Sequence, residues 1–296
     1  MLEHGFALPQ MPARLVVLGA GGFVGKACAD HCARNGMNVL RLGRADIDLT
    51  QRGSGAVLAA RLKSDDVLLV VSAIAPCKTP RMLADNVAMM AEVCDALAAR
   101  PVAHVIYVSS DAVYPDEPVP LTEAVPARPT TLHGAMHRTR EMMLAESAGS
   151  APYAILRPTL LYGQADPHNG YGPNRFRRLS AAGEPIVLFG EGEEKRDHVL
   201  IDDLAELAKR VVLNRSRGVL NIASGAVASF SEIAEMVVAI EGRPVDIRAT
   251  PRQGPMPHNG YRPFDIGVCR GAFPDFRYTP LKNGLERARR PMEQAA

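Results

Sequence analysis

A glycine-rich loop near the N-terminus has the spacing of a binding site for a phosphorylated ligand. The loop reads Gly19-Ala20-Gly21-Gly22-Phe23-Val24-Gly25. Gly19 permits a tight turn, Gly22 lets a pyrophosphate approach the backbone, and Gly25 lets the next helix pack closely. An apolar run at 14–19 precedes the loop and a helical pattern follows it, so the free N–H groups of a helix N-terminus would face the anion. These residues predict a dinucleotide site, with a plain glycine turn as the alternative.

The residues after the second expected strand bear on which dinucleotide is bound. A carboxylate there would hold the ribose 2′-hydroxyl of NAD, and an arginine would suit the 2′-phosphate of NADP. The strand at 38–42 is followed by Gly43 and Arg44, and Asp48 comes slightly later, where it can face the adenine instead. We therefore favour NADP over NAD, with a merely solvated Arg44 as the alternative.

Two histidines, His133 and His137, stand four residues apart in an expected helix. That spacing places both rings on one helix face, so they can point into one site. Because imidazole titrates near neutral pH, His133 can pass a proton without help from another side chain. His137 can hydrogen-bond ribose hydroxyls. The same spacing also allows a shared metal ion, which needs a third ligand, and Asp111 is the only local candidate for it.

Arginines gather in one part of a chain whose formal net charge is only +2. Five of them lie within forty positions: Arg157, Arg175, Arg177, Arg178 and Arg196. The net charge is too small to suggest a nucleic-acid binder, so any bound anion must be held by such a local cluster. Arginine forks suit phosphate oxygens, and a diphosphate ligand therefore fits. The alternative for Arg175, Arg177 and Arg178 is a solvated helix face.

The elements that must position these groups alternate between strand and helix. Unalternating apolar runs such as 14–19 and 67–73 are typical of strands buried on both faces, and helical patterns separate them. The alternation predicts an α/β fold, a Rossmann-type doubly wound parallel sheet with a smaller C-terminal substrate-binding region. We place an NAD(P)-binding domain at 1–160 and a mainly substrate-binding region at 161–296. Residues 198–223 are expected to return to the first domain.

Composition excludes several classes of protein. The chain has 296 residues, of which 47% are hydrophobic and 22% charged, and its apolar runs are too short to span a bilayer. A disordered chain is excluded by the same balance. The N-terminus lacks the pattern of a secretory signal. The five scattered cysteines do not form two pairs with the spacing of metal ligands. We expect a cytoplasmic protein with reduced thiols and with neither membrane nor nucleic acid as partner.

Motifs spread over nearly the whole chain resemble those of one known family. They are the glycine loop, Asn86, and the segments 108–114 (VSSDAVY), 122–126 (TEAVP), 157–159 (RPT), 190–197 (GEGEEKRD), 202–203 (DD) and 262–265 (RPFD). In this order they resemble the extended short-chain dehydrogenases/reductases, the NAD-dependent epimerase/dehydratase group that acts on nucleotide sugars. The resemblance implies bound NAD or NADP, a nucleotide-sugar substrate and hydride transfer at a sugar carbon.

The resemblance also implies roles for individual residues. The expected cofactor-binding residues are Gly19, Gly22, Phe23, Val24, Gly25, Arg44, Asp48, Ala73, Asn86 and His137. On the substrate side, Arg196 and Arg262 are expected to grasp the diphosphate, with Asp265 near the ribose and Asn174 near the sugar. No residue is assigned to a metal. Many relatives form homodimers through two helices, which here include 82–99 and the helix that begins near His133.

One departure from the family concerns its catalytic pair. The family places Tyr-x-x-x-Lys about two dozen residues after the active-site Ser or Thr, and His133 and His137 occupy both positions here. In the family the phenol exchanges a proton with the substrate hydroxyl, while the lysine lowers the pKa of the phenol and grips the nicotinamide ribose. The resemblance implies that Ser110 orients the substrate oxygen and that Asp111 matches an aspartate used as an acid by sugar dehydratases.

Three functions remain open at this point. The first is 4-keto reduction or epimerisation of a nucleotide-activated sugar, with His133 as acid/base and His137 on the ribose. The second is a catalytically silent NAD(P)-binding homologue with a scaffolding or sensing role. The third is a metal-dependent lyase or isomerase that uses His133 and His137. We expect the first.

Overall fold

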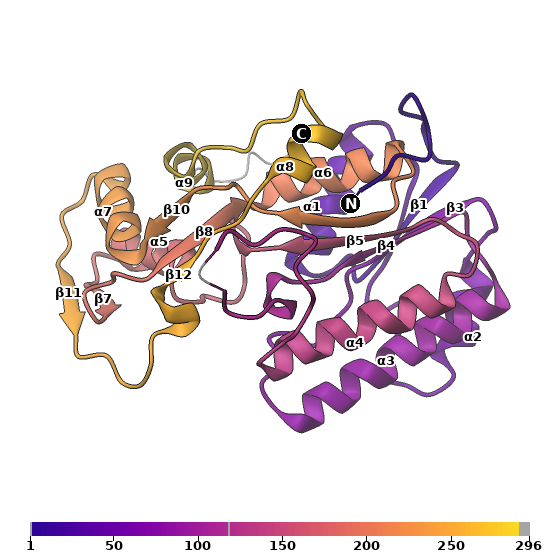
Figure 1. Cartoon of the computed structure of the whole chain (residues 1–296), viewed down its shortest axis with the longest axis horizontal. Coiled ribbons are helices and arrows are strands. Elements are labelled where there is room, and N and C mark those ends of the chain that lie inside the picture. The colour runs from indigo at the N-terminus through magenta and orange to yellow at the C-terminus, as the bar shows by residue number, and fades with distance from the viewer. Residues whose placement is uncertain (1, 118, 290–296) are drawn as a thin grey trace.

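A parallel sheet forms the centre of the larger part of the molecule (Figure 1). The computed structural model describes residues 2–117 and 119–289. The sheet has the strand order β2-β1-β3-β4-β5-β9, and every neighbouring pair is parallel. Its strands are β1 (Arg14–Leu18), β2 (Val39–Leu42), β3 (Asp66–Val70), β4 (His104–Val108), β5 (Tyr153–Pro158) and β9 (Gly218–Ile222). The unalternating apolar runs form buried strands, as the sequence predicts.

Helices cover both faces of this sheet, which confirms the doubly wound α/β architecture (Figure 1). One face packs against α1 (Phe23–Arg34) and α6 (Ile201–Leu213), and the other against α2 (Ser54–Arg61), α3 (Pro80–Ala99) and α4 (Leu132–Ser147). Successive residues of β1 divide between the two cores, with Val17 in the first and Val16 in the second. The chain returns late to this part, because α6 packs on α1 and β9 pairs with β5.

The smaller region is built around short strands of mixed direction. β8 (Lys195–Leu200) pairs in parallel with β6 (Leu160–Tyr162) and β12 (Tyr261–Arg262), and antiparallel with β10 (Val227–Ser229). β7 (Ile186–Phe189) and β11 (Ile247–Thr250) form a separate parallel pair. The short helix η1 (Asp111–Val113) and α8 (Gly267–Ala272) belong to the larger part, where η1 contacts α4 and α8 packs on β9. The remaining elements of the smaller region are α5 (Pro173–Ala182), α7 (Phe230–Glu241), α9 (Leu281–Arg289) and the short helix η2 (Pro257–Gly260). Phe176, Phe230 and Leu285 lie in its core.

Two local features place the functional loops. The strand expected at 67–73 ends at Val70, because the N–H groups of Val71 and Ser72 both turn to the carbonyl of Leu18. The residues that follow thereby lie over the glycine loop rather than in the sheet. At the start of α4, a Cβ on Gly134 would lie 2.0 Å from the carbonyl oxygen of Ala112, so glycine lets this helix lie directly against η1. Within the described residues, no helix is long and apolar enough to cross a membrane.

Candidate active site

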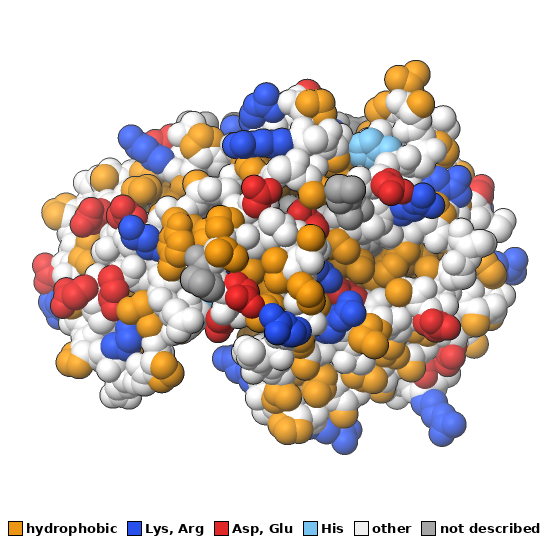
Figure 2. Space-filling view, in the orientation of Figure 1, with side chains coloured by type: hydrophobic (Ala, Val, Ile, Leu, Met, Phe, Trp, Pro, Cys, Tyr) orange, Lys and Arg blue, Asp and Glu red, His pale blue; other side chains and the backbone are white. Residues whose placement is uncertain are grey.

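A cavity of about 940 Å³ lies at the carboxyl ends of β1, β3 and β4. The strand order reverses between β1 and β3, and in open α/β sheets ligands bind at such a reversal. The cavity extends from the glycine loop, past Ser110 and the two histidines of α4, to Arg196 in the smaller region. Figure 2 shows the surface hollowed between the smaller region and the side of the molecule that carries α3 and α4. One continuous space therefore connects the glycine loop to the residues expected to contact substrate.

The glycine loop has the geometry that a bound diphosphate needs. Gly19 adopts a φ of +98°, and a Cβ on Gly25 would lie 2.2 Å from the carbonyl oxygen of Gly19. Glycine at both positions therefore lets α1 begin directly behind the loop. The helix N-cap is Gly22, no side chain among the described residues caps the first turn, and that turn carries no acidic residue. These N–H groups are available to an anion, and the residues present fit a dinucleotide pyrophosphate. Phe23, Val24 and Ala73 also line the cavity.

Arg44 and Asp48 lie together at the far end of the cavity, beyond β2. The side chain of Arg44 is 81% exposed and its Nη2 lies 3.5 Å from Oδ2 of Asp48. Hydrogen bonds from Thr50 lower the pKa of Asp48, which keeps its carboxylate charged. Both a cation and an anion are thus within reach of the same part of a bound cofactor, and this arrangement suits either NAD or NADP.

His133 and His137 bring their rings together on the cavity wall, edge to face, with centroids 4.7 Å apart. Nδ1 of His133 accepts a hydrogen bond from the backbone N–H of Cys77 at 3.3 Å. Nδ1 of His137 lies 2.8 Å from the hydroxyl oxygen of Tyr107. Burial lowers the pKa of both imidazoles, and more strongly that of His137, whose pKa is lowered further by His133 and Arg140. Both rings are therefore neutral at pH 7.

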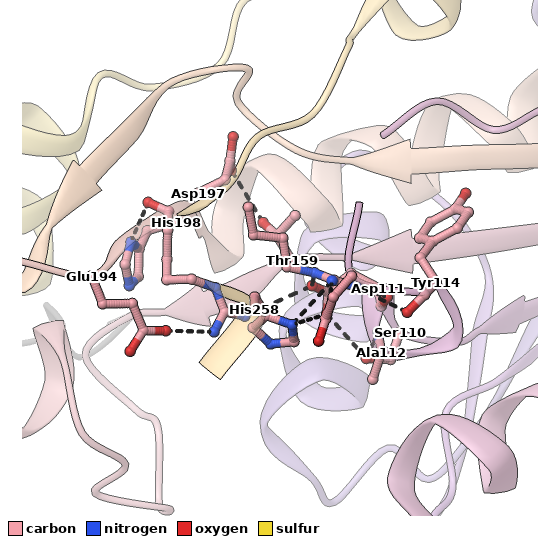
Figure 3. A network of polar contacts seen from close by, with 12 residues as sticks. Ser110, Asp111, Ala112, Tyr114, Thr159, Glu194, Asp197, His198 and His258 are labelled. Atoms are coloured by element: carbon pink, nitrogen blue, oxygen red, sulfur yellow. Dashed lines mark hydrogen bonds and ion pairs between the residues drawn. The ribbon is translucent and has the colours of Figure 1, made fainter. Parts of the chain in front are cut away.

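Ser110 and Asp111 stand opposite these rings at the end of β4. The backbone N–H of Ala112 donates to the Ser110 hydroxyl oxygen at 3.1 Å, and the hydroxyl lies 3.4 Å from Oδ1 of Asp111. Oδ2 of Asp111 accepts a hydrogen bond from Nε of Arg262 at 3.0 Å and lies 3.9 Å from Nη2 of Arg196. Figure 3 shows this network between η1, β8 and η2. Asp111 thus links the sheet to the smaller region as an ion-paired carboxylate.

Four of the expected binding residues do not offer a free polar group to the cavity. Asn86 is fully buried and holds the backbone N–H and carbonyl of Ile74, which itself lines the cavity. Arg262 is 1% exposed and is bonded to Asp111, Asp116 and backbone carbonyls. Asp265 is exposed and accepts from the N–H of Gly267. Asn174 lines the cavity, but its amide bonds to Gly163 and Asp166. Asn86 and Asn174 thus hold backbone of the cavity wall, and Arg262 holds Asp111, whereas Asp265 lies outside the cavity lining.

The structure adds residues that the sequence argument missed. His198 and His258 line the cavity beside Arg196. Nδ1 of His198 lies 3.2 Å from the carbonyl oxygen of Arg196, while Nε2 has no partner among the described residues, and burial lowers the pKa of this ring to about 3. His198 follows Arg196 by two positions in a strand, so period-two spacing would have placed both on one face. Tyr107 and Arg140 lie behind the rings of His133 and His137 (the imidazole pair) and belong to none of the sequence motifs.

A metal centre finds no support in the part of the chain that the structure describes. No three histidine, cysteine, aspartate or glutamate side chains there gather in the manner of a metal site. Nδ1 of each ring in the imidazole pair is already occupied by a hydrogen-bond partner. The third function considered from the sequence therefore lacks the ligand set that it needs.

Comparison with known proteins identifies the family. The model of the NAD dependent epimerase/dehydratase family matches residues 15–223, which is more than half of the chain. The chain belongs to this family. The epimerase/dehydratase family comprises NAD(P)-dependent enzymes that act on nucleotide sugars, and the resemblance noted in the sequence is thereby confirmed. The comparisons do not distinguish NAD from NADP.

Individual relatives within the epimerase/dehydratase family cover the chain to different extents. A dTDP-4-dehydro-6-deoxy-D-allose reductase of Streptomyces bikiniensis is 32% identical over 142 residues, which are 46% of this chain and 42% of that protein. The match thus spans less than half the length of that reductase. A dTDP-6-deoxy-L-talose 4-dehydrogenase (NAD(P)(+)) of Kitasatospora kifunensis is 25% identical over 303 residues, or 94% of each chain.

Solved structures of the same fold extend over nearly all of the chain. A GDP-L-fucose synthetase of Naegleria fowleri bound to NADP superimposes with a TM-score of 0.82 at 17% identity, covering 96% of this chain and 94% of that one. A UDP-glucose 4-epimerase of Thermotoga maritima with UDP-glucose gives a TM-score of 0.81 at 19% identity, covering 93% and 97%. At these identities the likeness establishes the fold of both regions of the molecule.

Proposed function

We propose that this protein is an NAD(P)-dependent oxidoreductase that transfers hydride at a carbon of a nucleotide-activated sugar, by reduction of a 4-keto group or by epimerisation. The observation that carries the proposal is the continuous cavity, which runs from the glycine loop through Ser110 and the rings of His133 and His137 to Arg196. A cofactor held at one end and a nucleotide sugar held at the other would meet beside those side chains. The relatives named for 4-keto sugar chemistry support the same reaction.

In this proposal the glycine loop and the first turn of α1 hold the cofactor pyrophosphate, and the ends of β1 and β2 hold its adenosine half. The nicotinamide, when bound, supplies or accepts the hydride. Arg196, whose side chain is 11% exposed and lines the cavity, is the cation available to a substrate diphosphate. Glu194 and Asp111 flank its guanidinium and fix the direction in which it points.

The imidazole pair and Ser110 act at the oxygen of the reacting carbon. Reduction of a carbonyl requires that this oxygen gain a proton, and oxidation requires that it lose one. The Ser110 hydroxyl, which the N–H of Ala112 orients, hydrogen-bonds the oxygen, while His133 and His137 provide the remaining polar groups on that wall. Because burial keeps both rings neutral at pH 7, each can donate a hydrogen bond there.

The first experiment is a fluorescence titration with NADPH and with NADH, which the absence of tryptophan makes simple. We expect saturable binding of at least one. Turnover is then tested with 4-keto-6-deoxy sugars carrying dTDP or GDP, and with UDP-glucose for epimerisation. Binding together with oxidation of the cofactor by one of the sugars supports the enzyme. Binding without turnover of any sugar in both directions would instead support a silent cofactor-binding homologue.

We further propose that two copies associate through α3 and α4. These helices pack side by side on one outer face of the sheet, and Met142 of α4 is 57% exposed there. Light scattering of the unmodified protein should give the mass of a dimer. Met142→Glu should shift this mass toward that of a monomer, whereas Val57→Glu on α2 should leave it unchanged. A monomer mass for both variants contradicts the proposal.

A further inference from the structure

The two imidazoles differ in the group that stands behind each ring. Nδ1 of His133 faces a backbone N–H, that of Cys77. Nδ1 of His137 faces a phenol hydroxyl, that of Tyr107. A backbone amide does not give up its proton near neutral pH, whereas a phenol is an acid of moderate strength. The two rings line one cavity but have different access to a proton.

The direction of the Tyr107–His137 hydrogen bond follows from burial. Tyr107 is 1% exposed, and within the described residues its hydroxyl has no acceptor other than Nδ1 of His137. A buried hydroxyl without an acceptor is costly, so the phenol donates to the ring. Burial raises the pKa of Tyr107 to about 12, and the phenol therefore keeps its proton at neutral pH. A neutral His137 that accepts at Nδ1 carries its own proton on Nε2.

His133 has no such proton source behind its Nδ1. Since Nδ1 accepts from Cys77, its neutral ring also carries the proton on Nε2. Loss of that proton would leave an imidazolate, because no proton can move from the amide to Nδ1. The charged form would direct an N–H at the N–H of Cys77. His133 is thus suited to donate a hydrogen bond and poorly suited to transfer a proton.

Arg140 supplies a positive charge behind the phenol. It is fully buried, and among the described residues no carboxylate pairs with it. Its guanidinium lies over the Tyr107 ring, 5.4 Å from the centroid, and donates to the carbonyl oxygen of Ser72 at 2.6 Å. Its charge lowers the pKa of the phenol against the larger effect of burial. A phenolate at Tyr107 would therefore form next to an unpaired cation.

We propose that Tyr107 exchanges the reaction proton through His137, and that His133 serves only as a neutral N–H donor to the sugar oxygen. The proposal rests on the proposed function and reassigns the proton from His133. As the sugar carbonyl is reduced, its oxygen takes the proton from Nε2 of His137, and Nδ1 takes the proton of the phenol. A phenolate remains beside Arg140. Water returns one proton to Nε2 and the phenol regains its own from Nδ1; oxidation runs these transfers in reverse.

Several titratable and charged groups face this relay from the elements packed around it. They are His133, Arg140 and Glu141 of α4, Tyr107 of β4, Tyr153 of β5 and Asp111 of η1. Of Tyr107, His137 and Arg140, His137 is the one that lines the cavity, so it is the catalytic residue of the relay, and Tyr107 and Arg140 are positioning residues that act through it.

Paired glutamine variants separate the two rings. Glutamine keeps a side-chain N–H but cannot pass a proton, so His133→Gln should lower kcat by about 10-fold and His137→Gln by about 100-fold or more. Tyr107→Phe should lower kcat by about as much as His137→Gln does, and it should leave the KM of the sugar nearly unchanged. Arg140→Lys, which keeps the cation, should retain more activity than Arg140→Met. Equal losses in the two glutamine variants, or full kcat in Tyr107→Phe, would overturn the relay.

A second readout does not depend on turnover. In ¹⁵N-histidine NMR spectra of the ligand-free protein at pH 7, His137 should show an unprotonated Nδ1 and a protonated Nε2. Tyr107→Phe should release this preference, whereas the signals of His133 should stay; the two glutamine variants assign the peaks. A protonated Nδ1 on His137 overturns the relay even in an active enzyme. If the tautomer is as expected and no sugar is turned over, the proposed function fails and the proton step falls with it.

Discussion

The two ends of the cavity are built by different means. At the glycine-loop end, the backbone itself forms the site, through the tight contact between Gly19 and Gly25 and the uncapped first turn of α1. At the imidazole end, side chains form it, through hydrogen bonds from Cys77 and Tyr107 to the two rings. A backbone site survives only if its glycines do, whereas a side-chain site can change its residues while the fold stays the same. A change of residues is therefore easier to accommodate at the imidazole end than at the glycine loop.

The largest effect is expected where side chains join the two regions. Arg262→Met removes the buried partner of Asp111, and breaking such a pair costs about 3–5 kcal/mol of unfolding free energy. Chemical denaturation measures it. The exposed pair Arg248–Asp246 is the control, and Arg248→Met should cost under about 1 kcal/mol. Equal small losses in both variants would mean that the Asp111 network does not hold the cavity walls.

The backbone end is tested by two alanine substitutions in one loop. A Cβ at position 25 meets the Gly19 carbonyl oxygen at 2.2 Å, and we expect Gly25→Ala to lose about 3 kcal/mol of stability and to lose cofactor binding. A Cβ at position 21 would meet no atom of the described residues within 4 Å, so Gly21→Ala should keep the thermal midpoint of the parent. A Gly25→Ala protein with normal stability and binding would contradict the close contact between loop and helix.

The loss of folding stability at acid pH should come from buried histidines rather than from the glycine loop. Burial lowers the pKa of His104 to about 4, below the value of about 6.5 in the unfolded chain. The unfolded state therefore binds more protons, and His104 costs stability as pH falls below about 6.5 until its folded pKa is reached. Between pH 6.5 and 5 the loss is about 2 kcal/mol. His104→Gln should flatten this slope in urea titrations, and an unchanged slope would contradict a neutral buried ring.

The smallest effect is expected at the exposed end of the cofactor site. If Arg44 contacts a 2′-phosphate, Arg44→Ala should weaken NADPH binding about tenfold and leave NADH binding unchanged, because one exposed charge-assisted contact is lost. Arg41 pairs with Asp30 outside the cavity lining, and Arg41→Ala is the matched control. Equal weakening of both cofactors by Arg44→Ala would assign the arginine to the adenine rather than to the phosphate.

The sequence predicts the backbone end of the site better than the side-chain end, for a physical reason. Glycine spacing and buried apolar runs are local in the chain, so the sheet, the loop and the position of α1 could be foreseen. The contact of Cys77 with His133 joins residues 56 positions apart, and that of Tyr107 with His137 joins residues 30 apart. Such partners follow from packing alone. Arg262 likewise matches a motif, but only the fold shows that its guanidinium is used internally.

Hydride transfer to a nucleotide-activated sugar can be followed with a deuterium label on the cofactor. The protein is incubated with NADPH or NADH deuterated at the transferring position and with a dTDP-activated 4-keto-6-deoxy sugar. Mass spectrometry and NMR then locate the label. We expect one deuterium on the former carbonyl carbon of the sugar, and none with Gly25→Ala. Cofactor that binds tightly yet leaves no deuterium on this sugar or on its GDP- and UDP-activated counterparts, in a protein that also fails to epimerise UDP-glucose, would rule out hydride transfer at these sugars.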